Sequence, residues 1–153
     1  MPSMVSESAS NYLNNKHEKT WVDTGFLVAL FARNDTYHDD AKMFIKTNQG
    51  VEMHSIWPVI VETCFFLNNE GKQALLKWLE RGAIVMHELT PRELPQIRKI
   101  NKQYSNIDPD FTDAALVSFA GQSKVRSILT VDQRDFSIYR FPDGNTFERL
   151  WVK

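Results

Sequence analysis

The sequence predicts a three-layer α/β domain, with a mainly parallel central sheet of four to five strands flanked by helices. Short apolar runs that suit strands alternate with longer runs that suit helices along most of the chain, and this alternation is typical of parallel sheets. The length of 153 residues fits one domain that folds without disulfides. Residues 1–18 are rich in Ser and Asn, so we expect a flexible lead-in there and one folded domain over 19–153.

Strand formers, turn residues and helix-stop signals set the predicted elements of the first half. Trp21 and Val22 favour a strand, which Gly25 ends before an apolar helix. Pro58 suits the first turn of a later helix, and Gly82 ends the helix after it. The predicted elements are a strand at 20–23, helices at 25–33 and 36–48, a strand at 51–56, and helices at 56–70 and 71–82.

The second half of the chain continues the alternation of strands and helices. Pro95 interrupts a basic run, which therefore forms one helix or a pair of helices. The apolar stretch FTDAALVSFAGQ predicts a short helix, and RSILTVD predicts a strand. The predicted elements are a strand at 83–89, a helical region at 90–105, a helix at 111–122, a strand at 126–132, and a short turn with a last edge strand from 134 onward.

Composition excludes several classes of protein. The chain has 18 Lys and Arg against 19 Asp and Glu, a net charge of -1, and a single cysteine, Cys64. One cysteine excludes an internal disulfide and a cysteine-based zinc cluster, and it suits a reducing compartment. The polar start lacks the apolar core of a signal peptide, and no run reaches the roughly 20 apolar residues of a membrane span. We therefore expect a cytoplasmic protein with no membrane association.

Four isolated acids stand against apolar runs: Asp23, Glu62, Asp113 and Asp132. Asp23 and Asp132 follow predicted strands, and the ligand crevice of an open α/β sheet lies outside the carboxyl ends of its strands. Asp113 falls in the first turn of its helix, where the helix dipole favours an anion. Glu62 has no lysine on its helix, and an unpaired carboxylate in apolar surroundings is costly. Together the four acids predict an oxygen-rich site for a hard cation such as Mg²⁺ or Mn²⁺.

Each acid also has a plainer interpretation. Asp23 is an N-cap and Asp113 a residue matched to the helix dipole, while Asp132 begins a turn and Glu62 pairs with a distant arginine. Capping alone does not explain why acids recur at one end of the sheet, so their joint placement favours a site. The chain has no GxxxxGK[ST] or GxGxxG loop, and no histidine stands beside a serine or Cys64 to activate it.

The residues that carry these acids resemble the PIN-domain family. The matching stretches are VDTGFLVALF, YHDDA, PVIVETCFFL, FTDAALVSFA and ILTVDQRDF, in this order across residues 20 to about 141. No single stretch is specific, but the ordered set is. The family consists of metal-dependent nucleases and includes the VapC-type toxins of bacterial toxin-antitoxin pairs. The resemblance therefore implies a metal-dependent endoribonuclease, with Mg²⁺ or Mn²⁺ as cofactor, RNA as substrate, a small antitoxin as partner, and a homodimer.

The resemblance also implies roles for individual residues. Asp23, Glu62, Asp113 and Asp132 are the catalytic acids that hold one or two cations. Asp135 is an auxiliary acid, and the hydroxyls of Thr24 and Thr130 lie near the site. His38 fits the second helix of the family as a structural residue.

Basic residues give a weaker prediction of the RNA-binding surface. Arg92, Arg98 and Lys102 lie in one helical region, and Arg98 and Lys102 are four apart on one helix face. A solvated surface is the plainer interpretation of such residues. Two alternatives to a ribonuclease also stay open at this point, namely a PIN-like fold kept as a non-catalytic interaction module, and a DNA-directed nuclease of the same superfamily.

Overall fold

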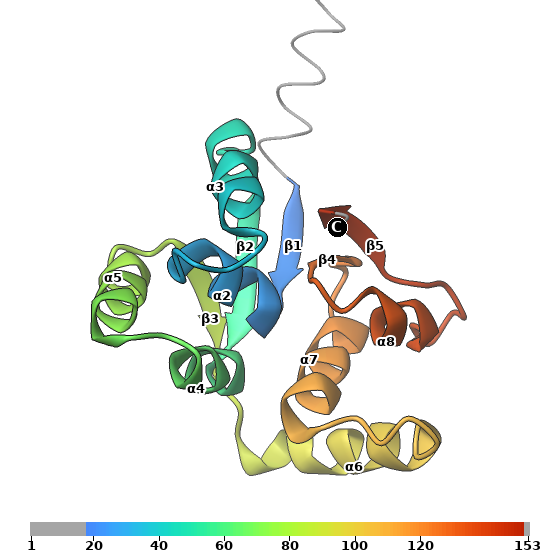
Figure 1. The fold of residues 1–153 in the computed structure, drawn as a ribbon. Coiled ribbons are helices and arrows are strands. Elements are labelled where there is room, and N and C mark those ends of the chain that lie inside the picture. The colour runs from blue at the N-terminus through green and yellow to red at the C-terminus, as the bar shows by residue number, and fades with distance from the viewer. Residues whose placement is uncertain (1–17, 152–153) are drawn as a thin grey trace, which may run out of the picture.

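The computed structural model describes residues 18–151. The lead-in expected over 1–18 therefore lies outside the described residues, apart from Glu18. In the described part of the chain, five strands form one parallel sheet in the order β3-β2-β1-β4-β5 (Figure 1), which confirms the predicted fold class. The strands are β1 (Lys19–Val22), β2 (Glu52–Ile56), β3 (Ile84–His87), β4 (Ser127–Leu129) and β5 (Glu148–Trp151).

Helices join the strands because parallel neighbours need crossover connections. Asn68 caps α5 by accepting a hydrogen bond from the Gly71 amide, and Thr90 and Glu93 form a capping box before α6. The helices are α2 (Thr24–Phe31), α3 (His38–Thr47), α4 (Trp57–Phe65), α5 (Asn69–Glu80), α6 (Leu94–Gln103), α7 (Phe111–Gln122) and α8 (Gln133–Ile138), with a 3-10 turn, η1 (Pro91–Glu93), before α6.

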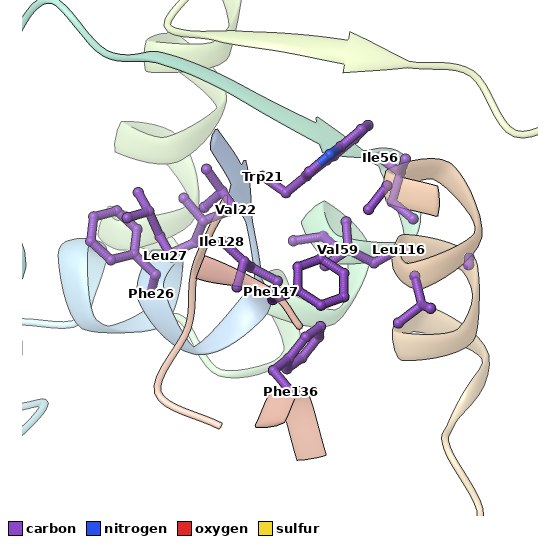
Figure 2. Close-up of a cluster of buried hydrophobic side chains, with 14 of the residues drawn as sticks. Trp21, Val22, Phe26, Leu27, Ile56, Val59, Leu116, Ile128, Phe136 and Phe147 are labelled. Carbon is purple, nitrogen blue, oxygen red and sulfur yellow. The ribbon is translucent and has the colours of Figure 1, made fainter. Parts of the chain in front are cut away.

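Helices cover both faces of the sheet, as three layers require. Trp21 of β1 points to one face, where its ring lies 6.4 Å from Phe119 of α7. Val22, the next residue, is in register with Leu129, and Leu129 with Trp151, so these side chains point to the other face. There Trp151 packs edge-on against Phe26 of α2 at 5.0 Å. Figure 2 shows Trp21, Val22 and Phe26 within the buried apolar cluster.

Two local predictions need correction. The segment from 134 onward is not a short turn, because residues 133–138 form α8 before β5 closes the sheet edge. The basic region at 90–105 is the predicted pair, η1 followed by α6, but Pro95 lies in the first turn of α6, where proline is tolerated. The break therefore precedes the proline. Among residues 18–151, no helix is long and apolar enough to span a bilayer.

Candidate functional site

The carboxyl ends of β1 and β4 bring Asp23 and Thr130 together. The two strands are parallel neighbours, and the pairing continues through a 2.9 Å bond from the Asp23 amide to the Leu129 carbonyl. Asp23 is the N-cap of α2, yet its side chain makes no capping bond. Its Oδ2 instead accepts a hydrogen bond from Thr130 Oγ1 at 2.9 Å. The plain capping interpretation of Asp23 is therefore wrong.

Asp113, Asp132 and Asp135 form a compact group of carboxylates at the same edge. One oxygen from each lies within 4.8 Å of the others. Asp132 caps α8 by accepting the Asp135 amide at 3.0 Å, and the Asp132 amide donates to Thr130 Oγ1 at 2.9 Å. Thr130 thus connects Asp23 on one side with Asp132 on the other.

Asp110 holds the start of α7 and fixes the position of Asp113. Its Oδ1 accepts the Asp113 amide at 2.8 Å, an N-cap that satisfies an otherwise unpaired donor. Asp113 is in the first turn of α7, as the sequence predicts. Asp110 was not among the predicted site residues. The signal that points to it is an acid three residues before another acid at a helix start.

Glu62 approaches from α4, and its pKa is raised by partial burial, although a hydrogen bond with the Thr112 side chain opposes this. The plainer interpretation of Glu62, an ion pair with a distant arginine, is wrong, because no ion pair in the described structure involves Glu62. The apolar neighbours of Glu62 are also not all buried, since Phe65 is 82% exposed.

The four predicted acids line a single cavity of about 450 Å³. Its other lining residues are Thr24, Gly25, Val28, Asp35, Thr36, Tyr37, Phe66, Asp110 and Val131. Asp135 lies just outside it, within the carboxylate group described above. The structure therefore brings together acids that are up to 109 positions apart in the sequence, between 23 and 132.

Burial and mutual repulsion raise the pKa of each of these acids. Burial is the largest cause for Asp113, whose pKa rises to about 8, with the charges of Asp23 and Asp110 next. Burial also raises the pKa of Asp23 to about 6, against the hydrogen bonds from Thr24 and Thr130. The pKa of Asp132 is raised by burial as well. Groups that resist ionisation together favour a cation that neutralises them.

Two buried hydroxyls, one of them in the wall of the acid cavity, have no hydrogen-bond partner within the part of the chain that is described. They are Thr24 Oγ1 and the Tyr139 hydroxyl. Thr24 is buried in the wall of the acid cavity, where a hydroxyl can bind a water or a ligand oxygen. Tyr139 was not predicted, and its position depends on tertiary packing alone.

The donors present fit a hard divalent cation. The acids offer carboxylate oxygens, which Mg²⁺ and Mn²⁺ prefer. The oxygens around one Mg²⁺ lie up to about 4.2 Å apart, and one oxygen from each of Asp113, Asp132 and Asp135 lies within a similar distance, 4.8 Å, of the others. No lysine, arginine or histidine among residues 18–151 forms an ion pair with Asp23, Asp113 or Asp132. The Thr24 hydroxyl at the same cavity has no hydrogen-bond partner among the described residues, so it is a further polar group that can contact a bound ligand.

Other predicted residues lie outside the acid cavity. Arg92 is exposed beside α6, and Arg98 and Lys102 are exposed on it, so the cavity lining does not include them. His38 Nδ1 lies 2.8 Å from the Ala29 carbonyl oxygen, which ties α3 to α2. The structural role expected for His38 therefore agrees with its position.

Comparison with known proteins identifies the family. Ribonuclease VapC26 of Mycobacterium tuberculosis is 27% identical over 130 residues, which cover 82% of this chain and 96% of that protein. The crystal structure of Mycobacterium tuberculosis VapC20, titled a Sarcin-Ricin loop cleaving toxin, has a TM-score of 0.68 at 18% identity and covers 75% of this chain and 91% of that chain. The PIN domain family matches residues 21–142, a segment that contains every acid of the cavity, and the chain therefore belongs to the PIN domain family.

Proposed function

We propose that this PIN domain protein is a Mg²⁺- or Mn²⁺-dependent endoribonuclease and the toxin of a type II toxin-antitoxin pair. The observation that carries the proposal is the convergence of Asp23, Glu62, Asp113 and Asp132 on one cavity. The relationship to Ribonuclease VapC26 over nearly its whole length supports RNA as the substrate. Because RNA is its proposed substrate, we place the protein in the cytoplasm.

Asp23, Asp113 and Asp132 are the proposed cation ligands, with Asp135 as the auxiliary acid beside them. Thr130 fixes the orientation of Asp23 through its hydroxyl, and Asp110 fixes the start of the helix that carries Asp113. A divalent cation bound there lowers the pKa of a water molecule and stabilises the charge that develops on phosphoryl oxygens.

Glu62 and Thr24 act on the substrate side in this proposal. Glu62 enters from α4, a different element from those that carry the three aspartates, so it can orient the attacking water. Burial raises its pKa, and a higher pKa makes a carboxylate a stronger proton acceptor. The Thr24 hydroxyl, which has no protein partner among residues 18–151, donates to a phosphate oxygen or to the water.

The activity test is incubation of the purified protein with mixed RNAs and Mn²⁺, beside Asp23→Asn and a chelator control. We expect cleavage by the wild type alone, and none after chelation or in the variant. Cleavage that survives both changes would exclude the proposed site. A parallel incubation with single-stranded and duplex DNA separates a ribonuclease from a DNA-directed nuclease.

An exposed apolar surface beside the acid cavity is the proposed antitoxin surface. Its large side chains are Trp57, Val61, Phe65 and Phe111, and they line a cavity of about 790 Å³. Glu62 and Asp110 line both cavities, so a chain bound on this surface also blocks the acids. Exposed apolar patches of this kind mark protein interfaces.

The partner test is to inspect the neighbouring reading frame for a small protein and to co-express that protein with this chain. We expect co-purification that Phe65→Asp abolishes. Met43 on α3 is also exposed, at 56%, but lies outside this surface, so Met43→Asp is the matched control and should co-purify as the wild type does. Light scattering of the free chain then measures whether it forms the proposed homodimer.

A further inference from the structure

Two histidines contact each other on the face of the sheet that α7 covers. His54 of β2 and His87 of β3 lie side by side, with His54 Nδ1 2.8 Å from His87 Nε2. His54 is 8% exposed, and its other ring nitrogen, Nε2, lies 2.7 Å from Glu52 Oε1. No other acid of residues 18–151 forms an ion pair with either histidine. The two histidines, called the histidine pair below, thus form one hydrogen-bonded line that begins at Glu52.

This line has room for one hydrogen at each of its two contacts. His54 Nε2 carries the hydrogen that it donates to the Glu52 carboxylate. The contact between the rings holds one hydrogen, either on His54 Nδ1 or on His87 Nε2, because a hydrogen bond joins one donor to one acceptor. If both rings were charged, two N–H groups would face each other across this contact. The histidine pair therefore carries at most one positive charge while the contact lasts.

The histidine pair belongs to a cluster of rings that joins α7 to the sheet. The Trp21 ring lies 5.0 Å from His87 and 5.8 Å from His54. Phe119 of α7 lies 6.0 Å from His87 and 6.4 Å from Trp21. A His87 ring that turns away from His54 therefore also leaves its packing between Trp21 and Phe119. The first turn of the same helix, α7, lines the acid cavity.

The charged groups nearby do not stabilise a second positive charge on the histidine pair. A cavity of about 690 Å³ opens beside the pair. Its charged lining residues, apart from the pair, are Glu18, Glu148, Lys19, Lys124 and Arg126. Neither glutamate forms an ion pair with a histidine, and Trp21, Phe119 and Ser123, which approach from β1 and α7, carry no charge. Burial and the charge of His54 lower the pKa of His87, which agrees with the limit of one charge.

We propose that the histidine pair is a pH-sensitive contact that holds α7 on the sheet and opens when both rings become charged. In the unfolded chain the two histidines are separate, and each takes a proton near about pH 6.5. The unfolded state therefore binds more protons in mild acid, and the contact loses stability as pH falls below about 6.5. Because α7 carries Asp113, opening the contact also weakens cation binding. Only this last consequence rests on the proposed function.

The experiment compares His87→Gln with His38→Gln in the full-length protein, in EDTA. Glutamine at position 87 keeps an N–H donor but takes no proton. His38 is the matched control, because its Nδ1 meets the Ala29 carbonyl oxygen, which a charged ring also satisfies. Urea unfolding gives the unfolding equilibrium constant of each protein from about pH 7.5 to about pH 5.5. All three proteins keep the acid cavity, so its pH dependence cancels in their ratios.

We expect the ratio of wild type to His87→Gln to rise by up to about tenfold over this range, the effect of one proton. The ratio of wild type to His38→Gln should not rise. Side-chain ¹H–¹⁵N NMR spectra of the folded wild type should show at most one charged ring in the histidine pair. Titration with Mn²⁺ alone should give a wild-type Kd that rises more steeply with acid than that of His87→Gln.

Each outcome supports or overturns the inference. A ratio of wild type to His87→Gln that is independent of pH would overturn it, and so would two charged rings in the folded protein. The NMR result needs no variant, so it decides even if His87→Gln does not fold. Equal pH dependence of the two Kd values would show that the contact does not act on the cation site. If the wild type binds no Mn²⁺, the proposed function fails, while the unfolding ratio and the NMR spectra still decide the inference.

Discussion

Thr130 donates a hydrogen bond to Asp23 across 2.9 Å, although the two residues are 107 positions apart in the sequence. The same hydroxyl oxygen accepts the Asp132 amide at 2.9 Å. One side chain at the end of β4 therefore sets the relative positions of two predicted metal ligands, one on its own segment and one on β1.

Replacing Thr130 with valine should weaken both the fold and the site. The change keeps the shape of the side chain but leaves the Asp132 amide and the Asp23 carboxylate without this partner, at a cost of about 1–3 kcal/mol. Urea unfolding should show that loss, and titration should show weaker Mn²⁺ binding. Thr130→Ser keeps the hydroxyl and is the matched control. Wild-type values for Thr130→Val would show that the hydroxyl has neither role.

The metal-free protein should become less stable as pH rises. The folded-state pKa values of Asp113, about 8, and Asp23, about 6, lie above 3.8, the ordinary pKa of an aspartate. The unfolded chain therefore releases these protons first, and the free energy of unfolding falls between about pH 4 and pH 8. Burial lowers the pKa of His87 from 6.5. This shift makes stability rise with pH and so opposes the trend, but only below pH 6.5.

Asp113→Asn should remove most of the pH dependence of the metal-free protein's stability between pH 7 and pH 8. It should also raise the melting temperature in EDTA at pH 8. The control is Asp143→Asn, because Arg126 lowers the pKa of Asp143 below its usual range and this group stays ionised throughout the window. A melting temperature of Asp113→Asn that falls with pH as steeply as that of the wild type would contradict the raised pKa.

Millimolar Mn²⁺ should raise the melting temperature of the wild type. A ligand at 100 times its Kd stabilises the folded state by about 2.7 kcal/mol, or roughly 5–10 °C for a domain of this size. The shift should be larger at pH 8 than at pH 6, because the ligands must lose their protons to bind. Asp113→Asn should reduce it. Melting curves that are indifferent to Mn²⁺ would argue strongly against a metal site.

Gly25→Ala should destabilise the acid site, because the added methyl group clashes with Val131. A Cβ at Gly25 would lie 2.2 Å from Val131 Cγ2, so either α2 or the segment before Asp132 must shift, at a cost of about 1–3 kcal/mol. Val131→Ala in the same chain should restore much of the loss in urea unfolding. Gly121→Ala is the control, because its Cβ meets no atom closer than 3.9 Å and a helix gains about 0.5–1 kcal/mol from the change.

Arg98→Glu with Lys102→Glu should weaken RNA binding and reduce its dependence on salt. Both residues are exposed on α6, outside the acid cavity, so Mn²⁺ binding should not change. Binding is measured in the Asp23→Asn background to prevent cleavage. Lys72→Glu with Lys77→Glu on α5 makes the same change in charge and should have little effect. Equal RNA affinity for the two double variants would show that α6 is not the RNA-binding surface.

The acids at the strand ends were predictable because topology places them. The carboxyl ends of adjacent parallel strands meet at one edge, so the positions of Asp23 and Asp132 after apolar strands were enough to predict their approach. Burial of Ser55 and Thr63 was not predictable from periodicity, because each depends on a hydrogen bond to a carbonyl oxygen, of Val22 and Val59 respectively.

Other features could not be predicted because they depend on short or tertiary signals. The helix α8 has six residues, fewer than two turns, so its apolar residues show no readable period. Glu62 was expected among buried neighbours, yet Phe65 and Phe66 are 82% and 64% exposed. An apolar run on a short helix does not reveal which side faces the core. Tyr139 depends entirely on contacts made after folding.

The central place of β1 in the sheet has a consequence for synthesis of the protein. β1 is the earliest strand of the described chain and lies between β2 and β4 in the sheet. β4 begins only at Ser127, more than 100 residues later in the sequence. A nascent chain that ends before β4 has an unpaired edge on its middle strand and lacks Asp132. The ribosome must therefore synthesise most of the polypeptide before the proposed metal ligands can come together, and truncated products should carry no cleavage activity.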